Sequence, residues 1–319
     1  MKTLRIGIVG AGHMGRLHAA KVVALRDAGA NVELAGIHDL ESARAREAAD
    51  RLGVQAAPDS DSLYRECDAV IAAVPTVAHF EVTKAALEAD LDVLVEKPIA
   101  ASLPEAEALI ALAEARGRVL QVGHLEWFNA ATRVIRSHVR APRFVEVRRV
   151  GPFPARATDV DVIRDLMIHD IDILQQLLGE EPSRIEALGV PVITDKIDIA
   201  NVRIEFPSGC IADLVASRVS RSPVRKMRFF QRDGFFSIDF AKQSASIYRR
   251  VVNGGEAWPS VEREKVSFEP ADALLAQLRA FVDGVEKRDD PLATARTGLG
   301  ALRTALRVVD AIPTLDGIV

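Results

Sequence analysis

The sequence predicts an α/β protein of two domains, in which a doubly wound parallel sheet precedes an α+β domain with a large, mostly antiparallel open sheet. The chain has 319 residues, which is enough for two domains. Short apolar segments alternate with helical stretches as far as residue 122, whereas from residue 143 onward most candidate strands follow one another directly. We therefore place the domains at residues 1–122 and 123–319.

Buried strands alternate with helices in the first domain. Leu4 to Val9 is an apolar run that ends at a glycine, which is typical of a buried parallel strand. Residues 40–52 are rich in Ala, Arg and Glu and favour a helix. The predicted strands are 4–9, 32–37, 69–74, 91–95 and 119–122, and the predicted helices are 14–28, 40–52, 78–89 and 103–116.

The second domain is expected to contain a strand-rich region and three helices. Residues 207–209 and 232–234 contain the glycines expected of hairpin turns, which favours antiparallel neighbours. The predicted helices are 160–178, 272–286 and 297–312, and the predicted strands are 143–150, 184–191, 197–206, 210–217, 224–231 and 235–240.

Composition and charge exclude several classes of partner. The 41 basic and 45 acidic residues give a net charge of −4, which offers no basic excess to neutralise a nucleic-acid backbone. We find no signal peptide and no apolar run that approaches the length of a membrane span, so we expect a cytoplasmic protein. Cys67 and Cys210 stand in or beside apolar runs, without metal-ligand spacing, and are interpreted as buried hydrophobic residues.

A glycine-rich segment directly follows the first strand and opens the first helix, which is the context of a dinucleotide-binding turn in a Rossmann domain. Gly10 permits the tight turn, Gly12 lets the backbone approach the pyrophosphate, and Gly15 allows close packing of helix on strand. The helix N-terminus offers N–H groups to the phosphates. The predicted contacts are Gly10, Ala11, Gly12, His13, Met14 and Gly15.

Asp39 follows the second strand at the position that contacts the adenosine ribose. A carboxylate there binds the two ribose hydroxyls and repels a 2′-phosphate, so we expect NAD rather than NADP. Arg44 and Arg46 could contact a phosphate, but we interpret them as part of a solvated helix face.

Three further segments go beyond a generic nucleotide-binding fold. Val74-Pro75-Thr76 is followed by His79, Glu96-Lys97-Pro98 follows a strand, and Asp165 precedes His169 by four residues on a later helix. Together with the glycine segment, in this order, they resemble the Gfo/Idh/MocA oxidoreductase family over essentially the whole chain. The resemblance implies that the cofactor is also contacted by Pro75, Thr76, His79, Glu96 and Lys97.

The physical interpretation agrees with that resemblance. Lys97 lies at the carboxyl end of a strand, where open α/β sheets bind their ligands. Asp165 and His169 share one face of the predicted helix, together with Asp172 and Gln176. The opposite face is apolar and contains Ile163, Met167, Ile171, Leu174 and Leu178. A merely solvated helix face is the alternative, which the Lys97 motif disfavours.

The resemblance implies a mechanism in which a substrate hydroxyl lies between Lys97 and His169. His169 is the expected general base, because its ordinary pKa of about 6.5 suits proton transfer near neutrality. Asp165 would orient the imidazole, and Lys97 would stabilise the developing charge on oxygen. Lys97 could be the base instead, and the sequence leaves this open. We identify no metal site, because a third ligand is missing.

Two segments narrow the choice of substrate class. Residues 122–129 and the stretch from Arg148 through Asp159 and Asp161 resemble the branch of the family that oxidises C3 of UDP-N-acetylglucosamine. That branch usually has Glu-Arg-Phe-Asn-Pro where Trp127 and Ala130 here replace the arginine and the proline, which could alter specificity. The expected substrate contacts are Lys97, His124, Trp127, Asn129, Arg149, Asp165 and His169.

Other functions stay open at this level. The substrate could be a cyclitol, a free sugar or another nucleotide sugar, and the chain could be a non-catalytic sensor of NAD or a metabolite. Intact Lys97, Asp165 and His169 argue against a sensor. The resemblance also implies a homodimer or homotetramer that associates through the open sheet.

Overall fold

The computed structural model describes residues 2–153, 160–251, 260–266, 271–288 and 295–313. The chain divides into two compact units. The first comprises Met1–Leu125 and Asp272–Leu299, and the second comprises Glu126–Ala271 and Gly300–Val319. Asp159 lies outside the described residues.

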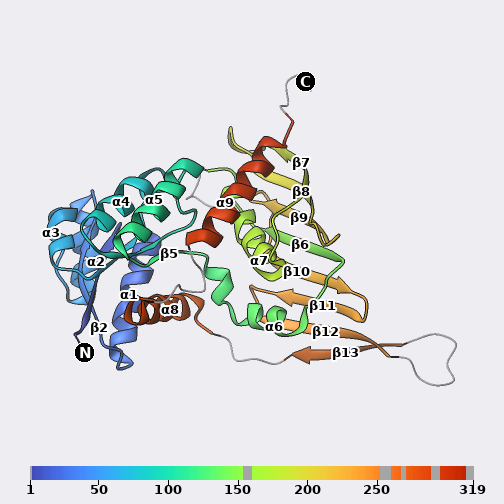
Figure 1. Cartoon of the computed structure of the whole chain (residues 1–319), viewed down its shortest axis with the longest axis horizontal. Helices are drawn as coiled ribbons and strands as arrows, with labels where there is room; N and C mark the ends of the chain where they lie inside the picture. Colours follow the sequence, from blue (N-terminus) through green and yellow to red (C-terminus); the bar gives the residue numbers. More distant parts are fainter. Residues whose placement is uncertain (1, 154–159, 252–259, 267–270, 289–294, 314–319) are drawn as a thin grey trace. The chain divides into compact units, whose positions relative to one another are not determined.

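The first unit is built on a five-stranded parallel sheet with strand order β2-β1-β3-β4-β5, which confirms the doubly wound prediction (Figure 1). Its strands are fully buried for much of their length because helices cover the sheet. The strands are β1 (Leu4–Val9), β2 (Val32–His38), β3 (Ala69–Ala72), β4 (Asp92–Val95) and β5 (Leu120–Val122). The helices are α1 (His13–Asp27), α2 (Ser42–Leu52), α3 (Ser60–Arg65), η1 (Thr76–Ala78), α4 (His79–Glu88), α5 (Leu103–Arg116) and α8 (Ala273–Lys287).

Helix α8 corrects the predicted domain division, because it belongs to the first unit although it comes late in the chain. Its apolar face joins the core beneath β1 and α1 through Leu278, Phe281 and Val282. Lys21 of α1 forms an ion pair with Asp272, the N-cap of α8, with 2.6 Å between Nζ and Oδ2. The two helices lie side by side in Figure 1. The range 123–319 is therefore not one continuous domain.

The second unit contains an eight-stranded sheet with order β13-β12-β11-β10-β6-β9-β8-β7. Among the described strands, β6 and β9 pair in parallel and the other neighbours are antiparallel, which confirms a mostly antiparallel sheet. The hairpin turns predicted at 207–209 and 232–234 join β8 to β9 and β10 to β11. The strands are β6 (Phe144–Val150), β7 (Arg184–Val190), β8 (Ile199–Glu205), β9 (Ile211–Ser217), β10 (Val224–Gln231), β11 (Gly234–Asp239), β12 (Ser244–Val251) and β13 (Ser260–Val266).

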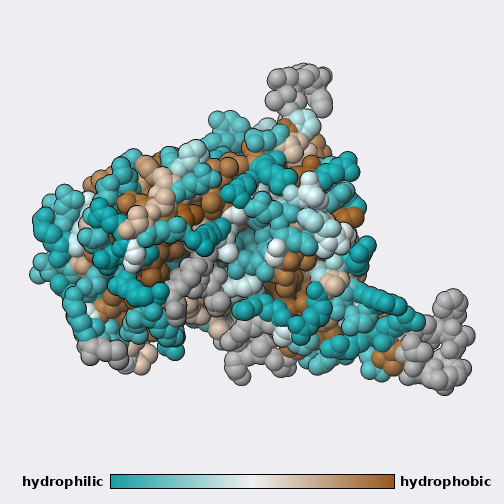
Figure 2. All heavy atoms as spheres, in the orientation of Figure 1, coloured by the Kyte–Doolittle hydropathy of each residue, from teal (hydrophilic) through white to brown (hydrophobic). Residues whose placement is uncertain are grey.

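Helices pack against one face of this sheet and form the second core with it (Figure 1). The helices are α6 (Ala130–His138), α7 (Ile168–Leu178) and α9 (Ala295–Asp310). The short helix η2 (Leu125–Phe128) precedes α6, and the π-helical turn η3 (Ile163–Met167) precedes α7. Only the residues of α9 from Gly300 onward belong to this unit. The sequence missed α3, α6, β12 and β13. Strand β13 is largely charged and exposed, so it carries no apolar alternation, and the region of β12 and β13 is mostly hydrophilic on the face shown in Figure 2.

Candidate active site

The glycine turn has no room for a side chain at two of its three glycines. Gly10 has a φ of +97°, and a Cβ there would lie 2.4 Å from the carbonyl oxygen of Ala73. A Cβ on Gly15 would lie 1.7 Å from the carbonyl oxygen of Gly10, so only glycine lets α1 approach β1 this closely. A Cβ on Gly12 would meet nothing within 4 Å, and no side chain caps the helix that follows. The Cβ position of Gly12, at the start of the helix, therefore faces open space.

Asp39 is fixed by two backbone N–H groups. Its Oδ2 accepts a hydrogen bond of 2.7 Å from Ala11, and its Oδ1 accepts one of 2.8 Å from Glu41. These contacts hold the carboxylate beside the glycine turn, and each oxygen retains a lone pair for a ribose hydroxyl. Arg44 pairs with Glu41 at 2.9 Å on the surface, as expected of a solvated helix face.

Two exposed aliphatic side chains flank the glycine turn and were missed in the sequence. Leu40 follows β2 and is 98% exposed, and Val77 lies in η1 after β3 and is 78% exposed. Strands β2 and β3 both neighbour β1, so the two side chains lie at the carboxyl edge on either side of the turn. Large apolar residues exposed at such an edge are typical of a ligand surface. Their position after predicted parallel strands could have indicated in the sequence that they belong to a ligand surface.

His79 is buried and linked to two turns of the first unit. Its Nδ1 lies 2.6 Å from the carbonyl oxygen of Pro98, and its Nε2 lies 3.0 Å from that of Val74. The ring is 1% exposed, and burial lowers its pKa below the ordinary value of 6.5. His79 thus holds the turn after β3 against the turn after β4, while a direct cofactor contact stays a prediction. Pro75 and Thr76 lie beside it, at the start of η1.

Lys97 directly follows Glu96 at the carboxyl end of β4. The Glu96 carboxylate lies between two groups, since Oε1 is 2.8 Å from Nε2 of His18 and Oε2 is 3.3 Å from the backbone nitrogen of Lys97. Burial would raise the pKa of Glu96, but the hydrogen bond with His18 and the charge of Lys97 hold it below its ordinary value. His18 was not singled out in the sequence, although it lies on the buried stripe of α1 with Val22 and Leu25.

Asp165 and His169 lie in the second unit, on the segment where a π-helical turn joins α7. Both are partly exposed, while Met167 and Ile168 beside them are buried. The predicted helix 160–178 thus contains a π-helical turn, and turns of this kind are frequent at functional sites. Asp161 fixes the start of the segment, because its carboxylate accepts hydrogen bonds from the backbone and side chain of Arg164 at 2.9 and 2.7 Å.

The polar face predicted for this helix needs one correction. Asp172 is only 2% exposed, and both of its carboxylate oxygens accept hydrogen bonds of 2.9 Å from Gln176. Asp172 is thus buried and not solvated. On the opposite face the prediction holds, because Ile163, Met167 and Leu174 are buried in the core of the second unit.

Arg149 is the centre of a buried ion-pair network. Its Nε and Nη2 each lie 2.8 Å from the carboxylate of Asp170, and its Nη1 lies 2.7 Å from Oε1 of Glu126. Arg149 is 3% exposed, whereas its neighbour Arg148 faces solvent, as the alternation of a strand requires. The network joins β6, η2 and α7 and so fixes the residue that follows His169. A contact between Arg149 and substrate stays a prediction.

The segment 124–129 is largely buried. His124 is 1% exposed and belongs to the first unit, while Trp127 and Asn129 are 8% and 7% exposed and belong to the second. The Arg136 guanidinium lies 5.0 Å from the centre of the Trp127 ring, and Asn129 caps α6 by accepting a hydrogen bond of 3.0 Å from Ala131. Trp127 and Asn129 therefore have structural contacts of their own, and substrate contacts there stay predictions.

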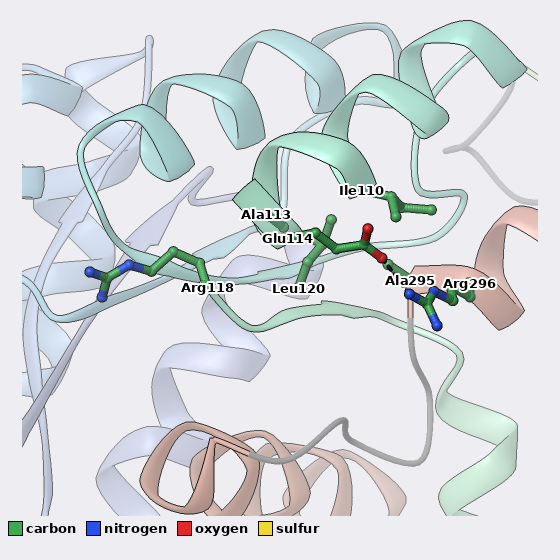
Figure 3. Close-up of a pocket in the computed structure, with 7 residues that line it drawn as sticks. All are labelled: Ile110, Ala113, Glu114, Arg118, Leu120, Ala295 and Arg296. Atoms are coloured by element: carbon green, nitrogen blue, oxygen red, sulfur yellow. Dashed lines mark hydrogen bonds and ion pairs between the residues drawn. The ribbon is translucent and has the colours of Figure 1, made fainter. Parts of the chain in front are cut away.

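A shallow pocket of about 170 Å³ in the first unit is not the cofactor site (Figure 3). It lies at the amino end of β5, whereas dinucleotides bind at the carboxyl ends of parallel strands. Glu114 and Arg296 close one side of it with an ion pair of 2.6 Å. Its lining residues are Ile110, Ala113, Glu114, Arg118, Leu120, Ala295 and Arg296.

The cysteines are poorly suited to catalysis, and the described residues show neither a metal cluster nor a membrane-spanning helix. Burial raises the thiol pKa of Cys67 to about 12 and that of Cys210 to about 11, and neither cysteine forms a disulfide. The described residues hold no cluster of three or more His, Cys, Asp or Glu side chains arranged for a metal ion. None of the helices that the structure describes is long and apolar enough to cross a membrane.

Comparison with known proteins identifies the family. Residues 4–124 match an oxidoreductase family with an NAD-binding Rossmann fold, and residues 131–237 match the Gfo/Idh/MocA C-terminal domain. The chain is 38% identical over 306 residues to a UDP-N-acetylglucosamine 3-dehydrogenase from Acidithiobacillus ferrooxidans, covering 96% of each. The chain belongs to the Gfo/Idh/MocA oxidoreductase family. It is a dehydrogenase whose Rossmann domain binds NAD.

Two solved structures and a further relative resemble this chain over nearly its whole length. The A. ferrooxidans enzyme superimposes with a TM-score of 0.91 at 38% identity, covering 98% of each chain. A scyllo-inositol dehydrogenase from Lactobacillus casei, with bound NAD(H) and scyllo-inositol, has a TM-score of 0.80 at 22% identity and covers 98% of this chain and 97% of its own, which shows the fold alone. A myo-inositol 2-dehydrogenase from Thermotoga maritima is 25% identical over 322 residues, covering 94% of this chain and 93% of that enzyme.

Proposed function

We propose that this Gfo/Idh/MocA dehydrogenase oxidises the C3 hydroxyl of UDP-N-acetylglucosamine, or of a closely related nucleotide sugar, to a ketone. The observation that carries the proposal is the 38% identity to a UDP-N-acetylglucosamine 3-dehydrogenase, which extends over 96% of both chains. That identity includes both units, so it concerns the substrate-binding part as well as the Rossmann fold.

The residues of the first unit fit NAD. The glycine turn would hold the pyrophosphate at the uncapped N-terminus of α1, and Asp39 would accept hydrogen bonds from the ribose hydroxyls. Leu40 and Val77 would pack against the adenine ring, because they are the exposed aliphatic side chains on either side of the turn. NAD supplies the acceptor for the hydride that leaves the carbinol carbon.

The side chains of the chain itself manage the proton. His169 accepts the hydroxyl proton as the hydride departs, so that a ketone and a protonated imidazole result. Asp165 holds the imidazole ring, and Lys97 donates a hydrogen bond to the oxygen as its negative charge develops. The presence of all three groups supports turnover rather than a sensor of NAD.

The test is NADH formation with UDP-N-acetylglucosamine, UDP-glucose, glucose and myo-inositol, with a carbonyl trap to remove the ketone. We expect turnover with UDP-N-acetylglucosamine and, in a Lys97→Met variant, a loss of at least about 100-fold in kcat with retained NADH binding. Turnover with UDP-N-acetylglucosamine by Lys97→Met at the wild-type rate would contradict the role of the lysine.

A cyclitol dehydrogenase is the second candidate, and the 25% identity to a myo-inositol 2-dehydrogenase over 94% of the chain favours it over other classes. Turnover with myo-inositol alone would establish this alternative. Trp127 would then be the first residue to exchange, because it replaces the arginine usual in the nucleotide-sugar branch.

We also propose that the protein is a cytoplasmic homodimer or homotetramer that associates through the outer face of the eight-stranded sheet. A row of four aromatic rings crosses that face, with centroid separations of 5.7, 5.4 and 4.1 Å. The row comprises Phe144, Phe230, Phe235 and Tyr248. Light scattering of the wild type and of Phe235→Lys tests this, since a monomeric wild type would contradict it.

A further inference from the structure

We propose that His18 is a positioning residue for Lys97, and that it acts through the carboxylate of Glu96. The proposal rests on the function proposed above, in which Lys97 contacts the substrate oxygen. It concerns the first unit only, where all three residues lie.

His18 is buried and lies against the carboxylate of Glu96. It is 0% exposed on α1, and its Nε2 lies 2.8 Å from Oε1 of Glu96. Its Nδ1 has no partner among the described residues. Nε2 is therefore the ring atom that contacts Glu96, and its N–H donates to the carboxylate, which can only accept.

Glu96 is constrained on three sides. Its backbone N–H donates to Ala72 at 3.0 Å, which continues the pairing of β4 with β3. His18 fixes Oε1, and Oε2 accepts the backbone N–H of Lys97 at 3.3 Å. Gly123, just beyond β5, leaves room for the carboxylate, since a Cβ there would lie 2.9 Å from Oε2.

The carboxylate in turn fixes the backbone from which the Lys97 side chain begins. A hydrogen bond to a charged acceptor is stronger than one between neutral groups, so the turn at Lys97 is held by a charge. Because α1 also carries the phosphate-binding glycine turn at its start, one pair of side chains connects the helix that binds NAD to the turn that bears the lysine.

A purely structural role would give a different result from a positioning role. A structural contact lowers stability when it is removed and leaves the catalytic rate of the folded enzyme unchanged. A positioning contact lowers kcat because a displacement of about 1 Å at a reacting group can cost about 100-fold in rate. It leaves the affinity for NADH nearly unchanged, since the phosphate and ribose contacts are intact.

The experiment compares His18→Leu with His18→Gln in the full-length enzyme. The glutamine amide can place an N–H near the position of Nε2, whereas leucine fills the space without a donor. We expect His18→Leu to lower kcat up to about 100-fold with little change in the NADH dissociation constant, and His18→Gln to restore most of the rate. Val22→Ala, which removes buried volume from the same face of α1 without touching Glu96, should lower Tm and leave kcat unchanged.

Gly123→Ala is an independent variant in case His18→Leu does not fold. The added methyl crowds Oε2 of Glu96 from the opposite side, so kcat should fall while NADH still binds. Wild-type kcat in both His18→Leu and Gly123→Ala overturns the proposal, as does a glutamine variant no faster than the leucine variant. A wild-type enzyme without turnover on any tested sugar instead removes the proposed function, which is a separate outcome.

Discussion

The two units fix their buried carboxylates in different ways. In the first unit, Glu96 is held by the imidazole ring of His18 and by one backbone N–H. In the second, Asp170 receives two hydrogen bonds from Arg149, which also binds Glu126. A guanidinium stays charged at any physiological pH. The comparison teaches that the second unit fixes its buried carboxylate with a permanent cation, whereas the first uses an imidazole and a backbone N–H.

The largest effect should follow from removal of the permanent charge. Arg149→Met leaves Asp170 buried without its hydrogen-bonded cation and leaves Glu126 with only Arg225, at 3.9 Å. Breaking such a buried pair typically costs about 3–5 kcal/mol of unfolding free energy. Urea denaturation measures this. Arg148→Met on the same strand is the matched control, because Arg148 is exposed and its loss should change stability by no more than about 0.5 kcal/mol. Equal effects of the two variants would contradict the network.

A pH series should reveal the titratable groups of the first unit. Burial holds the pKa of His79 below its ordinary value of 6.5, so the folded state binds fewer protons than the unfolded chain below that pH. Stability is therefore fully present above pH 6.5 and decreases as the pH falls through the folded pKa. The pKa of Glu96 is also held below its ordinary value of 4.5, so Glu96 likewise loses its contribution to stability as the pH falls. That loss begins only below about pH 4.5.

The measurement is the unfolding free energy from pH 8 to pH 5, at about one-unit intervals, for the wild type and His79→Gln. We expect the wild type to lose stability below about pH 6.5 and the variant to lose less, because the glutamine does not titrate. Identical slopes in the two proteins would show that His79 does not titrate in this range. Arg149 stays charged throughout this range and contributes nothing to the slope.

The smallest effects should come from helix caps, one in each unit. Asn129 caps α6 in the second unit, and Ser102 caps α5 in the first by a reciprocal pair of hydrogen bonds with Glu105. Asn129→Ala and Ser102→Ala should each cost about 1 kcal/mol of unfolding free energy. Asn129 also donates a hydrogen bond of 3.3 Å to Glu126. Chemical denaturation should therefore show a greater loss of unfolding free energy for Asn129→Ala than for Ser102→Ala. A larger loss for Ser102→Ala would argue against coupling of the cap to the Arg149 network.

The sequence predicts those parts of the fold and of the candidate site that depend on residues close together in the chain. The parallel strands of the first unit are short apolar runs, and the turn at Gly10–Gly15 follows the first of them directly. Periodicity also placed Met167 and Leu174 in the core correctly. These features depend on residues that are close in the chain, and each pattern has one physical interpretation.

The remaining features depend on contacts between distant residues. Nothing in the sequence of α8 says that Phe281 joins the core beneath β1, and the π-helical turn at Asp165 does not change the apolar spacing. The partners of Arg149 lie on other elements. His18 did carry a signal, because a histidine on the stripe of Val22 and Leu25 must be buried and requires a hydrogen-bond partner.

The central claim is hydride transfer from C3 of a nucleotide sugar to NAD, and isotope transfer tests it most directly. UDP-N-acetylglucosamine carrying deuterium at C3 would be incubated with the enzyme, NAD and a carbonyl trap, and the reduced cofactor analysed by mass spectrometry. We expect deuterium in the NADH that forms with the wild type and almost no labelled NADH with Lys97→Met. NADH formed without deuterium would contradict oxidation at C3, and no NADH at all would contradict the proposed substrate.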